Sequence, residues 1–244
     1  MNDLKLRCIS LLIAIFVAFG MVTAVTGEVN AASGKITVTV YSQAGENKVY
    51  AGERGSIDVS YEKGNEINSL PIKSVKIISG KTKAKVKQAT VTGEYGEKQK
   101  VYYVVGKKAG KVKISVKYKL KGKVKTKLKT ITVKPCPNAV ESLEINGSKK
   151  VLTGEKKFVY NAECKKTKVN VKITPAEGWE ITDAYGYKGY MKNKEEKTVW
   201  IDEADSKVKD GTAISFKSKY THILLSVDLE KDGKVINYQI DLHR

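Results

Sequence analysis

Apolar and polar positions alternate with a period of two along most of the chain beyond residue 34. Val, Ile and Tyr occupy one parity, and Lys, Ser and Thr occupy the other. This alternation is typical of half-buried β-strands, and no helical period of 3.6 residues is sustained. In the first half the pattern predicts strands over residues 35–41, 55–61, 72–79, 85–95, 98–105, 111–119 and 123–134.

Short strands separated by glycine-containing turns are typical of a β-sandwich. The second half shows the same alternation, which predicts strands over residues 140–145, 156–164, 169–174, 212–217, 225–229 and 235–240, with a helical turn over residues 202–210. Pro135-Cys136-Pro137 marks the seam between the halves, because its prolines oppose helix and cannot donate to a strand ladder. We therefore expect an all-β chain of two tandem sandwiches, over residues 33–134 and 135–244.

The most basic stretch, residues 111–129, predicts a hairpin with lysine at nearly every second position. A three-residue loop at residues 120–122 places Tyr118 opposite Val124, whereas a two-residue loop sets apolar residues opposite lysines. The apolar pattern favours the longer loop. The alternation slips at Thr130-Ile131, where a bulge would keep Ile131 and Val133 facing the core. This register also opposes lysine with lysine, which requires a solvated face: Lys119 with Lys123, Lys117 with Lys125, and Lys113 with Lys129.

A second hairpin is predicted around Asp232-Gly233, a dipeptide typical of two-residue turns. The turn pairs Leu229 with Ile236, and the same register places His222 opposite His243. Two facing histidines suit a transition metal, but His243 is the penultimate residue of the sequence and strand ends fray. We expect no metal site and no cofactor.

The N-terminal stretch has the pattern of an export signal. Lys5 and Arg7 precede an uncharged run from Cys8 to Gly27, and Val29-Asn30-Ala31 offers a small-residue cleavage site. We expect residues 1–32 to be a cleaved signal peptide and the protein to be secreted or associated with the cell surface, with no membrane span after cleavage. The alternative is that the apolar run is retained as an anchor.

The charge of the chain is concentrated in its first half. Residues 35–134 hold 24 Lys and Arg against 7 Asp and Glu, and residues 135–244 hold 19 against 17, so the nets are +17 and +2. The electrostatic field of the basic first half attracts anionic envelope polymers or glycans. Nucleic acid is not an expected partner, because export removes most targets and arginine is scarce. The candidate anion-binding residues are Lys113, Lys117, Lys119, Lys123, Lys125, Lys127 and Lys129.

Lysines on a strand have a second interpretation, since they also keep sheet edges soluble and unpaired. Both interpretations remain open at the level of the sequence. Lysine without arginine favours diffuse attraction over bidentate recognition in either case.

Catalytic motifs are absent from the sequence: it has no nucleophile elbow, no H-E-x-x-H and no phosphate loop. We expect a binding module rather than an enzyme. The aromatic segment AYGYKGYMK offers an alternative ligand site, because Tyr185, Tyr187 and Tyr190 could stack on sugars or contact a surface protein. The opposing interpretation places Trp179 and Trp200 in the core and the tyrosines at sheet edges.

The two cysteines beyond the leader are disulfide candidates. If Val140 pairs with Tyr160, then Cys136 lies opposite Cys164, provided that a one-residue bulge occurs near Glu141. Exported domains often contain disulfides. The alternative is a free cysteine in the linker.

Two segments carry a resemblance to a known family. Residues 105–135, VGKKAGKVKISVKYKLKGKVKTKLKTITVKP, contain an Ala-Gly turn, an alternating strand, a Gly hairpin and a terminal I-T-V-K-P. Residues 140–162, VESLEINGSKKVLTGEKKFVYNA, contain an opening strand, a G-E turn and a second strand. In these features the chain resembles the bacterial immunoglobulin-like domains found in tandem on adhesins and secreted surface proteins. The resemblance implies immunoglobulin-like sandwiches used for extracellular binding or adhesion.

Overall fold

The structure is a computed structural model, and it describes residues 34–92, 98–163, 165–166, 168–192, 195–201, 213–215 and 222–243. The signal peptide expected over residues 1–32 and the helical turn expected over residues 202–210 lie outside the described residues. In the part that is described, no helix has the length and apolar character needed to cross a membrane.

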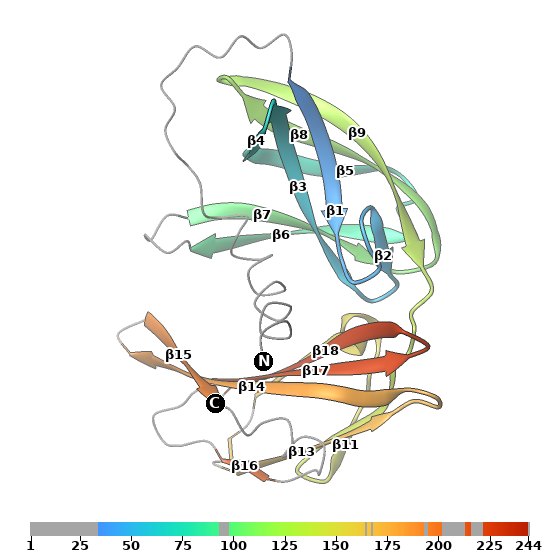
Figure 1. The fold of residues 1–244 in the computed structure, drawn as a ribbon, viewed down its shortest axis with the longest axis vertical. Helices are drawn as coiled ribbons and strands as arrows, with labels where there is room; N and C mark the ends of the chain where they lie inside the picture. Colours follow the sequence, from blue (N-terminus) through green and yellow to red (C-terminus); the bar gives the residue numbers. More distant parts are fainter. Residues whose placement is uncertain are drawn as a thin grey trace.

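The N-terminal half, up to residue 134, consists of two sheets. The first has the order β1-β3-β7-β6, with β4 paired to β3, and the second has the order β2-β9-β8-β5 (Figure 1). Their strands are β1 (Lys35–Tyr41), β2 (Lys48–Tyr50), β3 (Arg54–Lys63), β4 (Glu66–Ser69), β5 (Ile72–Ser79), β6 (Ala84–Thr92), β7 (Lys98–Gly106), β8 (Gly110–Leu120) and β9 (Lys123–Lys134).

The C-terminal half also consists of two sheets, with the orders β11-β10-β13-β16 and β12-β18-β17-β14-β15. A short 3-10 helix, η2 (Gly154–Lys157), precedes β12. The strands are β10 (Val140–Ile145), β11 (Ser148–Lys150), β12 (Val159–Glu163), β13 (Lys168–Pro175), β14 (Glu180–Lys192), β15 (Glu195–Ile201), β16 (Ala213–Ser215), β17 (His222–Lys231) and β18 (Lys234–His243).

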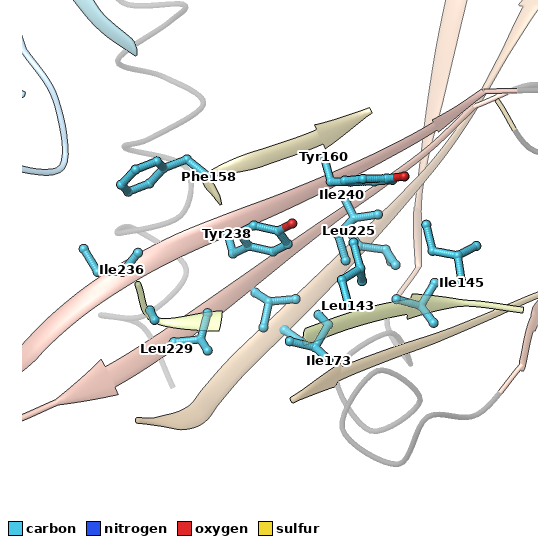
Figure 2. Packing of buried hydrophobic residues seen from close by; sticks show 14 of the residues in the cluster. Leu143, Ile145, Phe158, Tyr160, Ile173, Leu225, Leu229, Ile236, Tyr238 and Ile240 are labelled. Atoms are coloured by element: carbon cyan, nitrogen blue, oxygen red, sulfur yellow. The ribbon is translucent and has the colours of Figure 1, made fainter. Parts of the chain in front are cut away.

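Each half encloses its own cluster of buried apolar side chains between its two sheets. In the N-terminal half the cluster includes Val59, Val104, Ile114 and Ile131. In the C-terminal half Leu143 of one sheet faces the side chains of β17 and β18 (Figure 2). The all-β sandwich fold predicted from the alternation is confirmed, because the residues of the apolar parity form these interiors.

The hairpin around Asp232-Gly233 has the predicted register, with Leu229 opposite Ile236. Asp232 has φ 51° and Gly233 has φ 72°, as a two-residue turn of the mirror-image type requires. The register continues to the end of β18, where His222 pairs with His243.

The two halves contact each other through the segment around β2. Tyr50 is buried and joins the apolar cluster of the C-terminal half, where its ring stacks on Phe158 with centroids 6.0 Å apart and an interplanar angle of 8°. The carboxylate of Glu53 is buried beneath this segment and accepts hydrogen bonds from the backbone N–H groups of Tyr50 at 2.8 Å and Gln43 at 2.5 Å. Burial raises the pKa of Glu53, and these N–H donors partly oppose the rise.

Glu155 of η2 forms a second contact between the halves. Its Oε2 lies 2.5 Å from Arg54 Nε, and its Oε1 lies 3.0 Å from Lys85 Nζ and 2.7 Å from Lys87 Nζ. Partial burial acts to raise the pKa of Glu155, but hydrogen bonds from Lys87, Arg54 and Lys85 outweigh it and hold the pKa at about 2. One carboxylate therefore gathers three cations of the basic half.

Candidate functional site

The sheet β2-β9-β8-β5 concentrates the charge of the protein. It contains one lysine in β2, two in β5, four in β8 and five in β9, which makes twelve, and its strands contain no Asp or Glu. The neighbouring sheet is mixed, since β3 carries Asp58 and Glu62 beside its basic residues. We call β2-β9-β8-β5 the lysine sheet.

The predicted register of the central hairpin in this sheet is wrong. Leu120 pairs with Lys123 across a two-residue turn, so Tyr118 lies opposite Lys125 rather than opposite Val124. Lys121 has φ 47° and Gly122 has φ 76°, which fits a mirror-image two-residue turn. The expected bulge at Thr130 is also wrong, because one register runs from end to end of the β8–β9 pair.

The physical reason is a conflict between two apolar sets on β9. Val124 and Leu128 lie on one parity, and Ile131 and Val133 lie on the other. A single register can bury only one set, and it buries Ile131 and Val133 at 1% exposure each, leaving Val124 at 58% and Leu128 at 51%. The same register removes the predicted lysine–lysine pairs, whose repulsion would cost about 0.2 to 1 kcal/mol each.

This register divides the candidate lysines between the two faces of the sheet. Lys113, Lys117 and Lys119 alternate along β8 with buried Val112, Ile114, Val116 and Tyr118, so they project from the exposed face. We call them the outer row. The candidate lysines of β9 lie on the other face of the sheet, because they pair with the buried residues of β8 or with Leu120. We call them the edge lysines: Lys123, Lys125, Lys127 and Lys129.

The edge lysines occupy a part of β9 that has a neighbour on one side only. β2 pairs with β9 only from Thr132 to Lys134, so residues 123–131 form a free strand edge. The ammonium of Lys127 donates a hydrogen bond to the backbone carbonyl of Ile36 in β1, the edge strand of the facing sheet. Charged residues that point inward at an edge oppose pairing with another strand, so this group has a structural role of its own.

The outer row has different surroundings. Lys117 lies opposite Thr126, Lys113 opposite Thr130 and Lys119 opposite Val124. All three lysines are exposed, and within the described residues their ammonium groups make no ion pair or hydrogen bond. The outer row is therefore a set of uncompensated charges on a β-sheet surface.

The aromatic segment is a regular strand, although the strands predicted from the alternation do not include it. Tyr185, Tyr187 and Tyr190 all lie on β14, which pairs with β17 on one side and β15 on the other. Tyr185 is half-buried and its hydroxyl donates to Asp183 Oδ2. Trp179, just before the strand, is partly buried against the core of the C-terminal half, as one of the two interpretations expected. The same interpretation placed the tyrosines at sheet edges and is wrong on this point, because β14 is an inner strand of its sheet.

A polar cluster surrounds Tyr185, and none of its other members was a candidate from the sequence. Asp183 pairs with Asp228 across β14 and β17, and Asn237 Nδ2 donates to Asp228 Oδ1 and Ser226 Oγ, each at 2.7 Å. Burial raises the pKa of Asp228, the Asn237 hydrogen bond opposes the rise, and the nearby charge of Asp183 adds to it. The cluster depends on the pairing of strands that are distant in sequence, so residue spacing could not reveal it.

The strand pairing that would join the two cysteines does not occur. β10 pairs with β13 rather than with β12, and β12 pairs with β18 in parallel. The expected irregularity near Glu141 is present, but it lies in the β10–β13 pair. Cys136 is a free, half-buried thiol that packs against the C-terminal core, and Cys164 lies outside the described residues.

Comparisons with known proteins give no family. No protein-family model and no curated protein matches the chain. Among solved structures, domains 6–7 of the surface layer protein SbsC are 13% identical with a TM-score of 0.28, covering 86% of this chain and 99% of that one.

Two further structures are similarly distant. A chimeric titin Z1Z2 is 11% identical with a TM-score of 0.25, covering 86% and 95% of the two chains. A Legionella pneumophila protein of the DUF4785 family is 9% identical with a TM-score of 0.28, covering 88% of this chain and 58% of that one. Similarity at this level assigns neither a family nor a function.

Proposed function

We propose that the protein is an exported, cell-surface binding module that holds anionic envelope polymers or glycans by electrostatic attraction. The observation that carries this proposal is the lysine sheet, whose four strands contain twelve lysines and no acidic residue. A surface of one sign creates a potential that concentrates polyanions. The leader-like residues 1–32 support an extracellular location.

The proposal treats the two halves as tandem immunoglobulin-like domains with different tasks. The N-terminal half supplies the charge, with a net of +17 over residues 35–134. The C-terminal half is nearly neutral and is fixed to it by the contacts of Tyr50 and Glu155.

The proposal is tested with isolated cell walls. The full chain is expressed with its leader, and the exported protein is mixed with walls before and after chemical removal of their anionic polymers. The proposal predicts co-sedimentation with the intact walls and loss of it with the stripped walls. Equal sedimentation with both preparations contradicts it.

A second candidate, carbohydrate binding, is favoured by the cluster around Tyr185. An aromatic ring beside two carboxylates and an amide offers both stacking and hydrogen bonds to sugar hydroxyls. A glycan array tests it: neutral-sugar binding that is lost in Tyr185→Ala and retained in Lys117→Gln supports this candidate. Binding confined to anionic glycans contradicts it.

A further inference from the structure

The outer row has a regular spacing along one strand. Lys117 and Lys119 are two residues apart on β8, which separates side chains of one face by about 7 Å, and Lys113 lies about 14 Å from Lys117. Ser115 occupies the intervening position on this face and pairs with Leu128 of β9. Along β8 the positive charges of the outer row therefore lie on one line, with spacings of about 7 Å and about 14 Å.

Hydroxyl groups accompany these charges on the neighbouring strand. Thr126 lies opposite Lys117 and Thr130 lies opposite Lys113, and both threonines are exposed. A phosphate oxygen can accept from an ammonium and a hydroxyl together. Each of these two cross-strand pairs thus presents two donors to one anionic group.

Two apolar side chains of β9 share this face with the lysines. Val124 lies opposite Lys119, and Leu128 lies diagonally between Lys113 and Lys117. They are 58% and 51% exposed, although large aliphatic residues are usually buried. An uncharged carbon chain that crosses this face would cover both of them.

We propose that the outer row, together with Thr126, Thr130, Val124 and Leu128, is the binding face for a linear phosphodiester polymer whose phosphates are joined by short uncharged polyol links. The phosphates lie on the lysine–threonine pairs, and the links lie over the two aliphatic side chains. This inference rests on the proposed function and narrows it to one ligand class and one face. The edge lysines contribute only their long-range field.

An anionic bilayer fits this face less well than a polymer does. Both apolar side chains project from the exposed face of β9, and a flat sheet surface cannot insert them to the depth that interfacial segments reach. A single extended chain can instead follow β8 and meet each charge in turn. Tighter binding to anionic vesicles than to the polymer is therefore an outcome that contradicts the inference.

The test compares two triple variants of equal charge. Lys113→Gln/Lys117→Gln/Lys119→Gln removes the outer row, and Lys123→Gln/Lys125→Gln/Lys129→Gln removes three edge lysines without touching the Lys127 contact. The probe is poly(glycerol phosphate), and affinity is measured by isothermal titration calorimetry at several salt concentrations. Circular dichroism establishes that each variant is folded.

We expect the outer-row variant to lose at least about tenfold in affinity and the edge variant to lose less than about threefold. The slope of log K against log salt should fall in magnitude by about 2 in the outer-row variant, because three polymer contacts are lost. Equal losses in both variants, or tighter binding to anionic vesicles than to the polymer, overturn the inference while leaving the proposed function standing. A wild-type protein that binds no polyanion overturns both.

If the outer-row variant does not fold, a second substitution decides the question. Leu128→Ser keeps every charge and removes an exposed side chain. The inference predicts about a threefold or greater loss of polymer affinity with an unchanged salt slope. An unchanged affinity for the polymer contradicts the proposal that a polyol link lies over Leu128.

Discussion

Gln43 and Asn237, which lie 194 residues apart in the chain, are joined by two hydrogen bonds. Gln43 Nε2 donates to the backbone carbonyl of Asn237 over 2.9 Å, and the Asn237 N–H donates to Gln43 Oε1 over 2.7 Å. Asn237 lies on β18 just before the stretch that β12 covers, which starts at Gln239. The side-chain amide thus continues the ladder where β12 is missing, and it pairs with the half-buried backbone N–H and carbonyl groups of Asn237.

The close contact between the halves predicts a large difference between two glycine substitutions. Gly52 has φ +97°, and a Cβ there would lie 2.4 Å from the carbonyl oxygen of Gly154. Gly45 has nearly the same φ, +94°, but a Cβ there would meet nothing within 4 Å. Both substitutions to alanine strain the backbone, at a cost of about 1 to 2 kcal/mol, and only Gly52→Ala also forces the halves apart.

Thermal unfolding of the two variants measures this difference. We expect Gly52→Ala to lower the free energy of unfolding by at least about 1 kcal/mol more than Gly45→Ala. Small-angle scattering should show a changed envelope for Gly52→Ala alone. Equal destabilisation of the two variants means that the contact between Gly52 and Gly154 has no energetic role.

Glu155 predicts an acid-sensitive contribution to stability. Its pKa is about 2 in the folded protein against an ordinary value of 4.5. A depressed carboxyl pKa stabilises the fold above pH 4.5, and this contribution is lost as the pH falls from 4.5 to 2. Glu155→Gln should therefore cost about 1 kcal/mol at neutral pH, and the difference from wild type should vanish near pH 2.

Urea titrations at several pH values test this prediction, with Glu62→Gln as the control. Glu62 is 47% exposed and its oxygen lies 3.9 Å from Lys35 Nζ, so its removal should change stability by less than about 0.5 kcal/mol. A Glu155 variant whose deficit is the same at pH 2 and pH 7 refutes the assigned role of the charge.

The turn between β8 and β9 can be stabilised by one substitution. Lys121 adopts φ 47°, a conformation that asparagine tolerates better than lysine does. We expect Lys121→Asn to raise the unfolding free energy by about 0.5 kcal/mol. Lys123→Asn, just beyond the turn, should give no gain. A decrease in melting temperature for Lys121→Asn shows that the turn is not of the two-residue type.

The edge lysines predict a defect in solubility. Replacing Lys125, Lys127 and Lys129 with threonine leaves a free strand of high β-propensity on the edge of the sheet, which invites pairing with a second molecule. Light scattering should show dimers or larger species that form with time. The same replacement at Lys113, Lys117 and Lys119 should leave a monomer, because those positions lie on a sheet face. Aggregation of both variants to the same extent contradicts the division between edge and face.

Local alternation was sufficient to predict most strands. β1, β5, β9 and β10 have the bounds that the alternation predicts, since a sustained period of two marks the extent of a strand. The Asp232-Gly233 turn fixed the register of β17 and β18 because the apolar residues on both strands agree with it. Where the turn residues and the apolar alternation predict the same register, the local sequence is enough to predict the strand pairing.

Elsewhere the determining contacts are distant in sequence. On β9 two apolar sets compete, and the choice depends on Ile131 and Val133 packing against strands far from the hairpin. The parallel pairing of Val159 with Gln239 leaves no local pattern at all, and the Asp183–Asp228 cluster arises from a similar long-range pairing. The sequence therefore showed where the lysines concentrate, but not how they divide between the two faces of the lysine sheet.

The most direct test of the central claim is the salt dependence of binding by the wild-type protein. The affinity of the exported protein for poly(glycerol phosphate) is measured from 50 to 200 mM salt. Attraction by the lysine sheet predicts that affinity falls by about tenfold or more over this range, since each bound phosphate releases counterions. An affinity that stays constant over the range, or no binding at the lowest salt, contradicts the claim.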